Sequence, residues 1–133
     1  MMRLESLTPN LVVADIDRSI AFYRDLLGFT LSRTAPAEAP FAFAWMTRDG
    51  VNVFLNSLEA VRAESPALVE RPLGGTLTLF IVLEGIDALY ARAQTAASLM
   101  MPLKVQPYGM REFAIADPDG YVLTFAERIV GPE

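Results

Sequence analysis

The chain has 133 residues, of which 53% are hydrophobic, so it can bury a core and is too apolar to remain disordered. Its net charge of −5 argues against a nucleic-acid partner, because binding to nucleic acid needs lysine and arginine side chains that neutralise phosphates. The absence of cysteine and histidine excludes disulfides, thiolate nucleophiles and the commonest transition-metal ligand. We expect a cytoplasmic protein without a membrane partner, since the sequence has neither a bilayer-length apolar stretch nor a recognisable secretion signal.

The first half of the chain predicts one strand, one helix and three further strands. Asp15 stands where a helix N-cap belongs, and apolar residues then recur at the spacing of one helix face until Gly28 ends the pattern. Asp49 and Gly50 form a strong hairpin signal between the last two strands. The expected elements are a strand at residues 7–13, a helix at 16–27, and strands at 29–33, 41–47 and 51–56.

The second half repeats this plan, and matching residues are separated by about 70 positions along the sequence. Thr8 matches Thr78, and Gly50 matches Gly120, without a slip between them. The expected elements are a strand at residues 76–83, a helix at 86–97, strands at 102–107, 113–116 and 121–126, and a turn at 117–120. We interpret the pattern as an internal duplication.

The repeat predicts one structural domain built from two modules and a linker. The first module covers residues 1–57, the linker 58–75 and the second module 76–133. The linker contains two prolines and two glycines and can hold a short helix at residues 58–63. Its length allows the modules to pair within one chain or with those of another chain.

Two segments resemble the vicinal-oxygen-chelate superfamily, which includes glyoxalase I, fosfomycin and bleomycin resistance proteins, and extradiol dioxygenases. The first comprises LVVAD at residues 11–15 and SIAFYRDLLGF at 19–29, and the second comprises GMREF at 109–113 and DPDG at 117–120. The resemblance implies an α+β fold in which two tandem β-α-β-β-β modules form a curved mixed sheet around a ligand cavity. It is closest to the metal-free branch that resembles the bleomycin resistance proteins.

Metal-dependent members of that superfamily hold a divalent cation with histidine, glutamine or glutamate on the first and last strands of each module. The resemblance puts these positions at Thr8, Phe54, Thr78 and Thr124. Threonine binds divalent metals weakly and phenylalanine does not bind them, and register slips of two residues bring no carboxylate to these positions. We therefore expect no metal and no cofactor.

The cavity surface can be predicted from the hairpin at Asp49-Gly50. A two-residue turn pairs Trp45 with Phe54 on one face, and Phe43 and Thr47 with two asparagines. This surface is aromatic with amides at its edge, which suits a flat ligand, although the same aromatic residues could instead fill a collapsed core. The amides need partners, which could be a ligand, water or backbone. The candidate ligand-binding residues are Thr8, Asn10, Phe43, Trp45, Asn52, Phe54, Asn56, Thr78, Phe80, Tyr108, Met110, Arg111 and Thr124.

These observations favour a non-catalytic protein that binds and sequesters a small aromatic or heteroaromatic drug or metabolite. The resemblance implies a homodimer, because pockets of that branch are commonly built from both chains. An alternative is a metal-dependent lyase, isomerase or dioxygenase with a displaced site, which would need Glu84, Glu112 or Glu127 to converge in the cavity. A third possibility is a structural or regulatory module whose own side chains fill the cavity.

Overall fold

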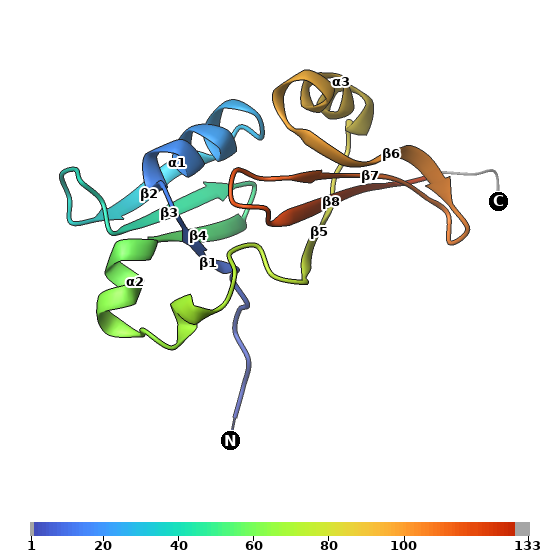
Figure 1. Ribbon diagram of the computed structural model, residues 1–133. Coiled ribbons are helices and arrows are strands. Elements are labelled where there is room, and N and C mark those ends of the chain that lie inside the picture. The colour runs from blue at the N-terminus through green and yellow to red at the C-terminus, as the bar shows by residue number, and fades with distance from the viewer. Residues whose placement is uncertain (1, 130–133) are drawn as a thin grey trace. The chain divides into compact units, whose positions relative to one another are not determined.

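The computed structural model describes residues 2–129 and divides into two compact units between Glu70 and Arg71. Each unit contains one four-stranded mixed sheet and a helix that packs against one face of that sheet (Figure 1). The α+β class and the two tandem β-α-β-β-β modules predicted from the sequence are thereby confirmed.

The first unit begins with a strand, a helix and three further strands. These are β1 (Asn10–Val13), α1 (Ile16–Asp25), β2 (Thr30–Ala35), β3 (Phe43–Arg48) and β4 (Val51–Ser57), followed by α2 (Leu58–Glu64) and the short 3-10 helix η1 (Leu68–Glu70). The sheet order is β1-β4-β3-β2, with β1 parallel to β4 and the other pairs antiparallel. The helix predicted after the first module is therefore present as α2.

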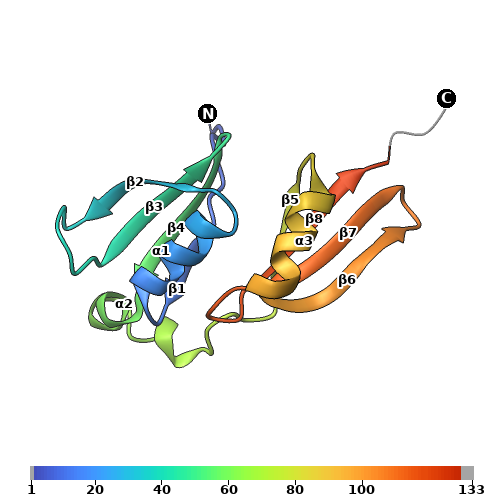
Figure 2. The ribbon, with the colours of Figure 1, turned by 90° about the horizontal axis from the view of Figure 1, so that it is seen from above.

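Helix α1 forms where the sequence predicts it and covers one face of the first sheet. The Asp15 carboxylate accepts a hydrogen bond of 3.1 Å from the Arg18 backbone N–H, which satisfies one of the free donors of the first turn. Ile16, Ile20 and Tyr23 lie on one face of the helix and are buried. Helix α1 packs against β3 and β4, whose buried residues are Ala44, Met46, Val53 and Leu55. Figure 2 shows α1 lying over this sheet.

The second unit has the same order of elements and the same topology. Its elements are β5 (Thr78–Val82), α3 (Ile86–Ala96), β6 (Ser98–Gln106), β7 (Met110–Ala116) and β8 (Val122–Arg128). The sheet order is β5-β8-β7-β6, and β5 is parallel to β8. Helix α3 packs against β6, β7 and β8, and the core beneath it includes Phe113, Ile115, Leu123 and Phe125.

The two sheets share only part of their strand-pairing register. This corrects the expectation that the second module repeats the first without a slip. Asn10 lies opposite Phe54 and Phe80 opposite Thr124, so the parallel pairs match at the expected offset. In the hairpins, Trp45 lies opposite Phe54 but Ala114 lies opposite Thr124, a difference of one residue.

The physical cause of this slip is the turn of each hairpin. Asp49 and Gly50 both have positive φ and close a two-residue turn between Arg48 and Val51. The second hairpin closes between Ala116 and Val122 over a longer loop, which the Asp117 carboxylate stabilises by accepting hydrogen bonds from backbone N–H groups of that loop. Because side chains alternate along a strand, one residue of slip moves every side chain of β7 to the other face.

Several strand limits also differ from the expectation. Strand β1 begins at Asn10 rather than at residue 7, because Pro9 has no N–H to donate, although its carbonyl accepts from Phe54 N–H at 2.9 Å. Strands β6 and β7 begin earlier than expected, at Ser98 and Met110. None of the helices in residues 2–129 is long and apolar enough to cross a membrane.

Candidate functional site

The face of the first sheet opposite α1, which we call the first open face, collects six of the predicted site residues. They are Asn10, Phe43, Trp45, Asn52, Phe54 and Asn56. The three cross-strand pairs predicted from the turn are confirmed by the register of β3 and β4. The Phe43 and Phe54 ring centroids lie 5.2 Å apart and those of Trp45 and Phe54 lie 5.8 Å apart, both edge-to-face. The three rings therefore form one continuous, half-buried aromatic surface.

The amides of this face have partners within the protein. Trp45 Nε1 donates to Asn52 Oδ1 at 2.9 Å, which restricts the orientation of the indole. Asn56 Nδ2 donates to Asn10 Oδ1 at 2.6 Å and to the Leu11 carbonyl at 3.2 Å. Backbone is one of the partners that the sequence left open, and it is present as the Leu11 carbonyl, whereas the side-chain partners were not anticipated. These bonds fix the orientation of the side chains on this face.

The corresponding face of the second sheet, which we call the second open face, is chemically different. The Thr78 and Thr124 hydroxyl oxygens are 2.7 Å apart and share a hydrogen bond. Phe80 lies on the same face of β5 with 52% of its surface exposed. Ala114, opposite Thr124, stands where the first unit has Trp45. The accessible groups of this face are the hydroxyls and the Phe80 ring, because Ala114 is buried, and it has no stacked rings within residues 2–129.

Tyr108 and Glu112 form a hydrogen-bonded pair near the start of β7. The Tyr108 hydroxyl donates to the Glu112 carboxylate, which is only 3% exposed, whereas Tyr108 itself is 63% exposed. The hydrogen bond, together with some burial, raises the pKa of Tyr108 above its ordinary value. Met110 is half-buried and shares the parity of Glu112. Met110 and Arg111 lie within β7, whereas Tyr108 lies in the turn that precedes this strand.

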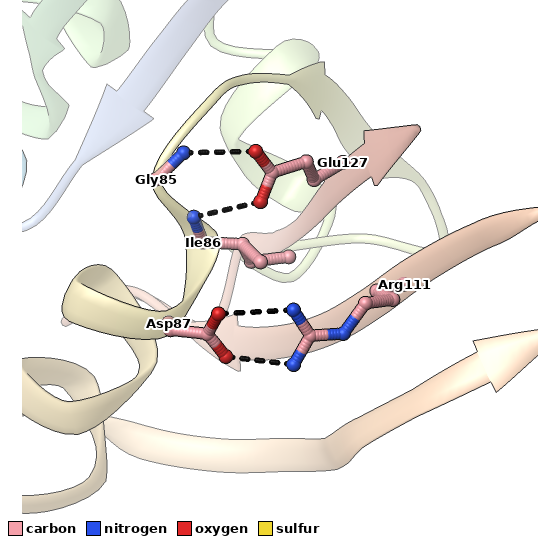
Figure 3. Close-up of polar contacts among 5 residues, drawn as sticks. All are labelled: Gly85, Ile86, Asp87, Arg111 and Glu127. Carbon is pink, nitrogen blue, oxygen red and sulfur yellow. Dashed lines mark hydrogen bonds and ion pairs between the residues drawn. The ribbon is translucent and has the colours of Figure 1, made fainter. Parts of the chain in front are cut away.

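Arg111 points toward α3 and is engaged in an ion pair (Figure 3). Its two terminal nitrogens bind the Asp87 carboxylate at 3.0 and 2.6 Å. The hydrogen bond from Arg111 lowers the pKa of Asp87, and the same bond raises the pKa of Arg111. The parity of Arg111 matches that of Phe113, which packs on Tyr90 of α3, so Arg111 lies on the helix side of the sheet. We therefore leave Arg111 out of the proposed binding surface.

Glu127 caps the first turn of α3 from β8. Its carboxylate oxygens accept from the Gly85 and Ile86 backbone N–H groups at 3.1 and 3.2 Å (Figure 3). Gly85 has no side chain with which to cap the helix, so a distant residue supplies the acceptor. Glu127 is thereby directed to the helix and away from the second open face, as its parity predicts.

The four positions that the resemblance assigns to metal ligands are distributed over both units. Thr8 lies before β1, Phe54 belongs to the aromatic surface, and Thr78 and Thr124 bind each other. Glu84 is exposed. Within residues 2–129, no three histidine, cysteine, aspartate or glutamate side chains are grouped so that they could hold a metal ion.

One residue of the first open face was not anticipated from the sequence. Arg33 on β2 lies opposite Trp45, because β2 contains a bulge between Leu31 and Arg33. Strict alternation from Thr30, which lies opposite Thr47, would have put Ser32 at this position. A bulge has no reliable signature in a single sequence, so only the structure reveals this neighbour.

Comparisons with known proteins agree with this architecture. The family model described as Glyoxalase/Bleomycin resistance protein/Dioxygenase superfamily matches residues 3–125. Proteins named bleomycin resistance protein from Geobacillus stearothermophilus and Staphylococcus aureus are 35% identical over 128 residues, covering 91% of this chain and 95% of each relative.

Solved structures show the same fold. A glyoxalase/bleomycin resistance protein/dioxygenase from Nocardioides superposes with a TM-score of 0.77 at 27% identity, covering 100% of this chain and 89% of that one. TioX from Micromonospora sp. ML1 superposes with a TM-score of 0.75 at 22% identity, covering 94% of this chain and 99% of that one.

Proposed function

Because the chain belongs to the Glyoxalase/Bleomycin resistance protein/Dioxygenase superfamily, we propose that it binds and sequesters a small aromatic or heteroaromatic drug or metabolite without transforming it. The observation that carries the proposal is the first open face, where Phe43, Trp45 and Phe54 form one surface. Aromatic rings bind flat ligands by stacking and by removing apolar area from water. The ligand class is that of the relatives named bleomycin resistance protein, so bleomycin is the first compound to test.

The amides give this surface a fixed shape and a polar edge. Asn52 holds Trp45, and Asn56 is held by Asn10 and Leu11, so little side-chain freedom remains to be lost on binding. Asn52 uses its oxygen for Trp45, which leaves its Nδ2 group without a partner in residues 2–129. In the proposed complex this group donates to an acceptor on the ligand.

Thr8, Thr78, Phe80, Tyr108, Met110 and Thr124 are part of the proposal as a secondary set of contacts. Most of them belong to the second unit and offer hydroxyl groups and one exposed ring. We propose them as a second candidate ligand-contacting set, with weaker contacts than the stacked rings of the first open face. We therefore expect substitutions in the first open face to weaken ligand binding more than substitutions in this secondary set.

We also propose a homodimer and a cytoplasmic location. β5 is an edge strand of its sheet and carries Phe80 and Val82, which are 52% and 43% exposed. Exposed apolar residues on an edge strand favour pairing with another surface. Light scattering coupled to size-exclusion chromatography tests the dimer, with Phe80→Lys expected to shift it toward the monomer. Cell fractionation tests the location.

The experiment that tests the function is a titration of the purified protein with bleomycin and a panel of planar aromatic compounds. Trp45 is the lone tryptophan, so its fluorescence reports directly on the first open face. We expect a saturable change for at least one compound, and mass spectrometry should recover that compound unaltered. A protein that leaves every compound unbound, or converts one into a product, contradicts the proposal.

A further inference from the structure

The bulge in β2 brings a single cation, Arg33, to the first open face on the edge strand beside β3. Thr30 lies opposite Thr47 and Leu31 opposite Met46, after which Ser32 is skipped and Arg33 lies opposite Trp45. Cross-strand partners project from the same face with Cβ atoms roughly 4.5–5.5 Å apart. Bulges are often found beside binding sites, where they redirect a side chain. The bulge here makes Arg33 the cross-strand neighbour of Trp45.

Arg33 is the only charged residue of the four strands that lies on this face. The four strands of the first sheet contain no aspartate or glutamate, and their other cation, Arg48, has a different role. Arg48 shares the parity of Met46 on the helix side, donates to the Leu27 carbonyl at 2.7 Å and pairs with Asp49 at 3.3 Å. Arg33 is exposed, and its side chain makes no hydrogen bond or ion pair within residues 2–129. Its five donors are therefore available to a ligand.

The second open face lacks this arrangement. The residue opposite Ala114 on β6 is Met101, which carries no charge. Lys104 lies opposite Glu112, so a positive group there faces a negative one. An uncompensated cation beside an aromatic surface is thus found on the first open face and not at the matching position of the second.

We propose that Arg33 selects ligands in which a carboxylate is attached to the flat aromatic ring system. This inference rests on the proposed function and adds the charge of the ligand to it. A ring stacked on Trp45 and Phe54 brings a carboxylate on its rim within reach of the guanidinium, whose planar fork binds carboxylates through two parallel hydrogen bonds. The net charge of −5 acts over longer distances and is screened by salt, whereas this contact is direct.

The test uses three naphthalene probes that share one ring system and differ only in charge. They are naphthalene-2-carboxylate, naphthalene-2-carboxamide and 2-naphthylmethylammonium, titrated calorimetrically into the full-length protein at low and at moderate salt. We expect the carboxylate to bind roughly tenfold more tightly than the carboxamide, as for a charged hydrogen-bonded pair, and the ammonium compound to bind most weakly. Added salt should narrow the difference between carboxylate and carboxamide.

Two variants assign the preference to its residue. Arg33→Gln should remove the tenfold preference by weakening binding of the carboxylate much more than binding of the carboxamide, and Arg33→Lys should keep part of it. Arg62→Gln, which removes another cation of the same unit on α2, should leave all three affinities as they are. Circular dichroism of each variant checks that the fold is intact.

The outcomes separate this inference from the proposed function. Equal affinities for carboxylate and carboxamide, or a preference that survives Arg33→Gln, would overturn the role of Arg33 while ring binding, and with it the proposed function, still stands. Failure of all three probes, of bleomycin and of the aromatic panel to bind overturns both.

Discussion

In the first unit, the strand positions that face away from the helix carry Phe43, Trp45 and Phe54, whereas the matching positions of the second unit carry Glu112, Ala114 and Thr124. The helix sides of both sheets remain apolar and buried. The two units thus preserve the packing that holds a helix on a sheet and differ on the sheet face away from the helix, where Glu112 and Ala114 are themselves buried. A duplicated frame can keep its core and specialise one face for a ligand, because core packing constrains only one side of each strand.

The helices of the two units also begin differently. Asp15 caps α1 from the adjacent position in the chain, whereas α3 is capped by Glu127, which lies on β8 more than 40 residues away. The first cap is local and the second depends on the folded sheet. Five predictions test how far these differences extend, beginning with the largest effect.

Truncation of the buried aromatic of α1 should be the most destabilising change. Tyr23 is 0% exposed and packs edge-to-face on Phe22 and Phe29, while Ala93 stands at the matching position of α3. Tyr23→Ala should lower the free energy of unfolding by roughly 3–5 kcal/mol, as for other large-to-alanine core changes. Tyr90→Ala, at a half-buried ring of α3, should cost less in the same urea titrations followed by circular dichroism. Equal losses would show that the two helices are packed alike.

Removal of one ring from the first open face should weaken ligand binding strongly. Phe54 touches both Phe43 and Trp45, so Phe54→Ala opens the middle of the aromatic surface. We expect a loss of about 2 kcal/mol, or roughly thirtyfold in Kd, for the tightest compound of the aromatic panel. Thr124→Ala is the matched change in the second unit and should alter Kd by less than about threefold, since exposed polar contacts contribute little. A larger effect of Thr124→Ala would move the site to the second unit.

A substitution at Gly74 should disturb the loop that sets the register of the second hairpin. Gly74 has a φ of +91°, and a Cβ atom there would lie 2.8 Å from the Gly120 carbonyl oxygen. Gly74→Ala should therefore cost roughly 2–3 kcal/mol through strain and steric contact. A Cβ atom at Gly50 in the first hairpin would have no neighbour within 4 Å. Gly50→Ala should therefore cost only about 1 kcal/mol of stability, which comes from the φ of +80° at this position. Urea midpoints at constant m value measure both, and the reverse order would contradict this account.

Loss of either cap should destabilise the protein by a similar and moderate amount. Asp15→Ala and Glu127→Ala each remove an acceptor for free N–H groups of a first helical turn, which costs about 1 kcal/mol. The two caps should behave differently in isolated helix peptides, because only the α1 peptide contains its own capping residue. Residues 14–28 should lose helicity on Asp15→Ala, whereas residues 84–98 lack Glu127 and should be weakly helical from the start. Equal helicity of the two wild-type peptides would argue against a tertiary cap.

The smallest effect should appear at acid pH in the Asp87–Arg111 pair. Its hydrogen bond lowers the pKa of Asp87 in the folded protein, so the pair contributes stability above the ordinary carboxyl pKa of 3.8 and loses it as pH falls through the folded value. Asp87→Asn should therefore lose less stability than wild type between pH 5 and pH 2, measured by thermal unfolding. Asp25→Asn is the control: Asp25 pairs with Arg24, its neighbour in the sequence, which stays close to it when the chain unfolds, so we expect a smaller pH effect.

Much of the fold could be predicted from the sequence because its signals are local. Asp15 and the apolar spacing after it define α1, and Asp49-Gly50 defines a two-residue turn, which in turn places Trp45 opposite Phe54. The composition of the first open face follows from that turn and from alternation along the strands. The likeness between the two halves was visible for the same reason, since matching cores need matching apolar positions.

Other features depend on contacts between distant residues and were decided by the tertiary structure. The longer loop held by Asp117 shifts β7 by one residue, so that Phe113 faces the helix although Phe43, its match in the sequence, faces outward. The bulge in β2 brings Arg33 to Trp45, and the cap of α3 comes from Glu127. Alternation and helix periodicity describe one segment at a time. Register, bulges and distant caps are set by the pairing of segments, which only the folded chain specifies.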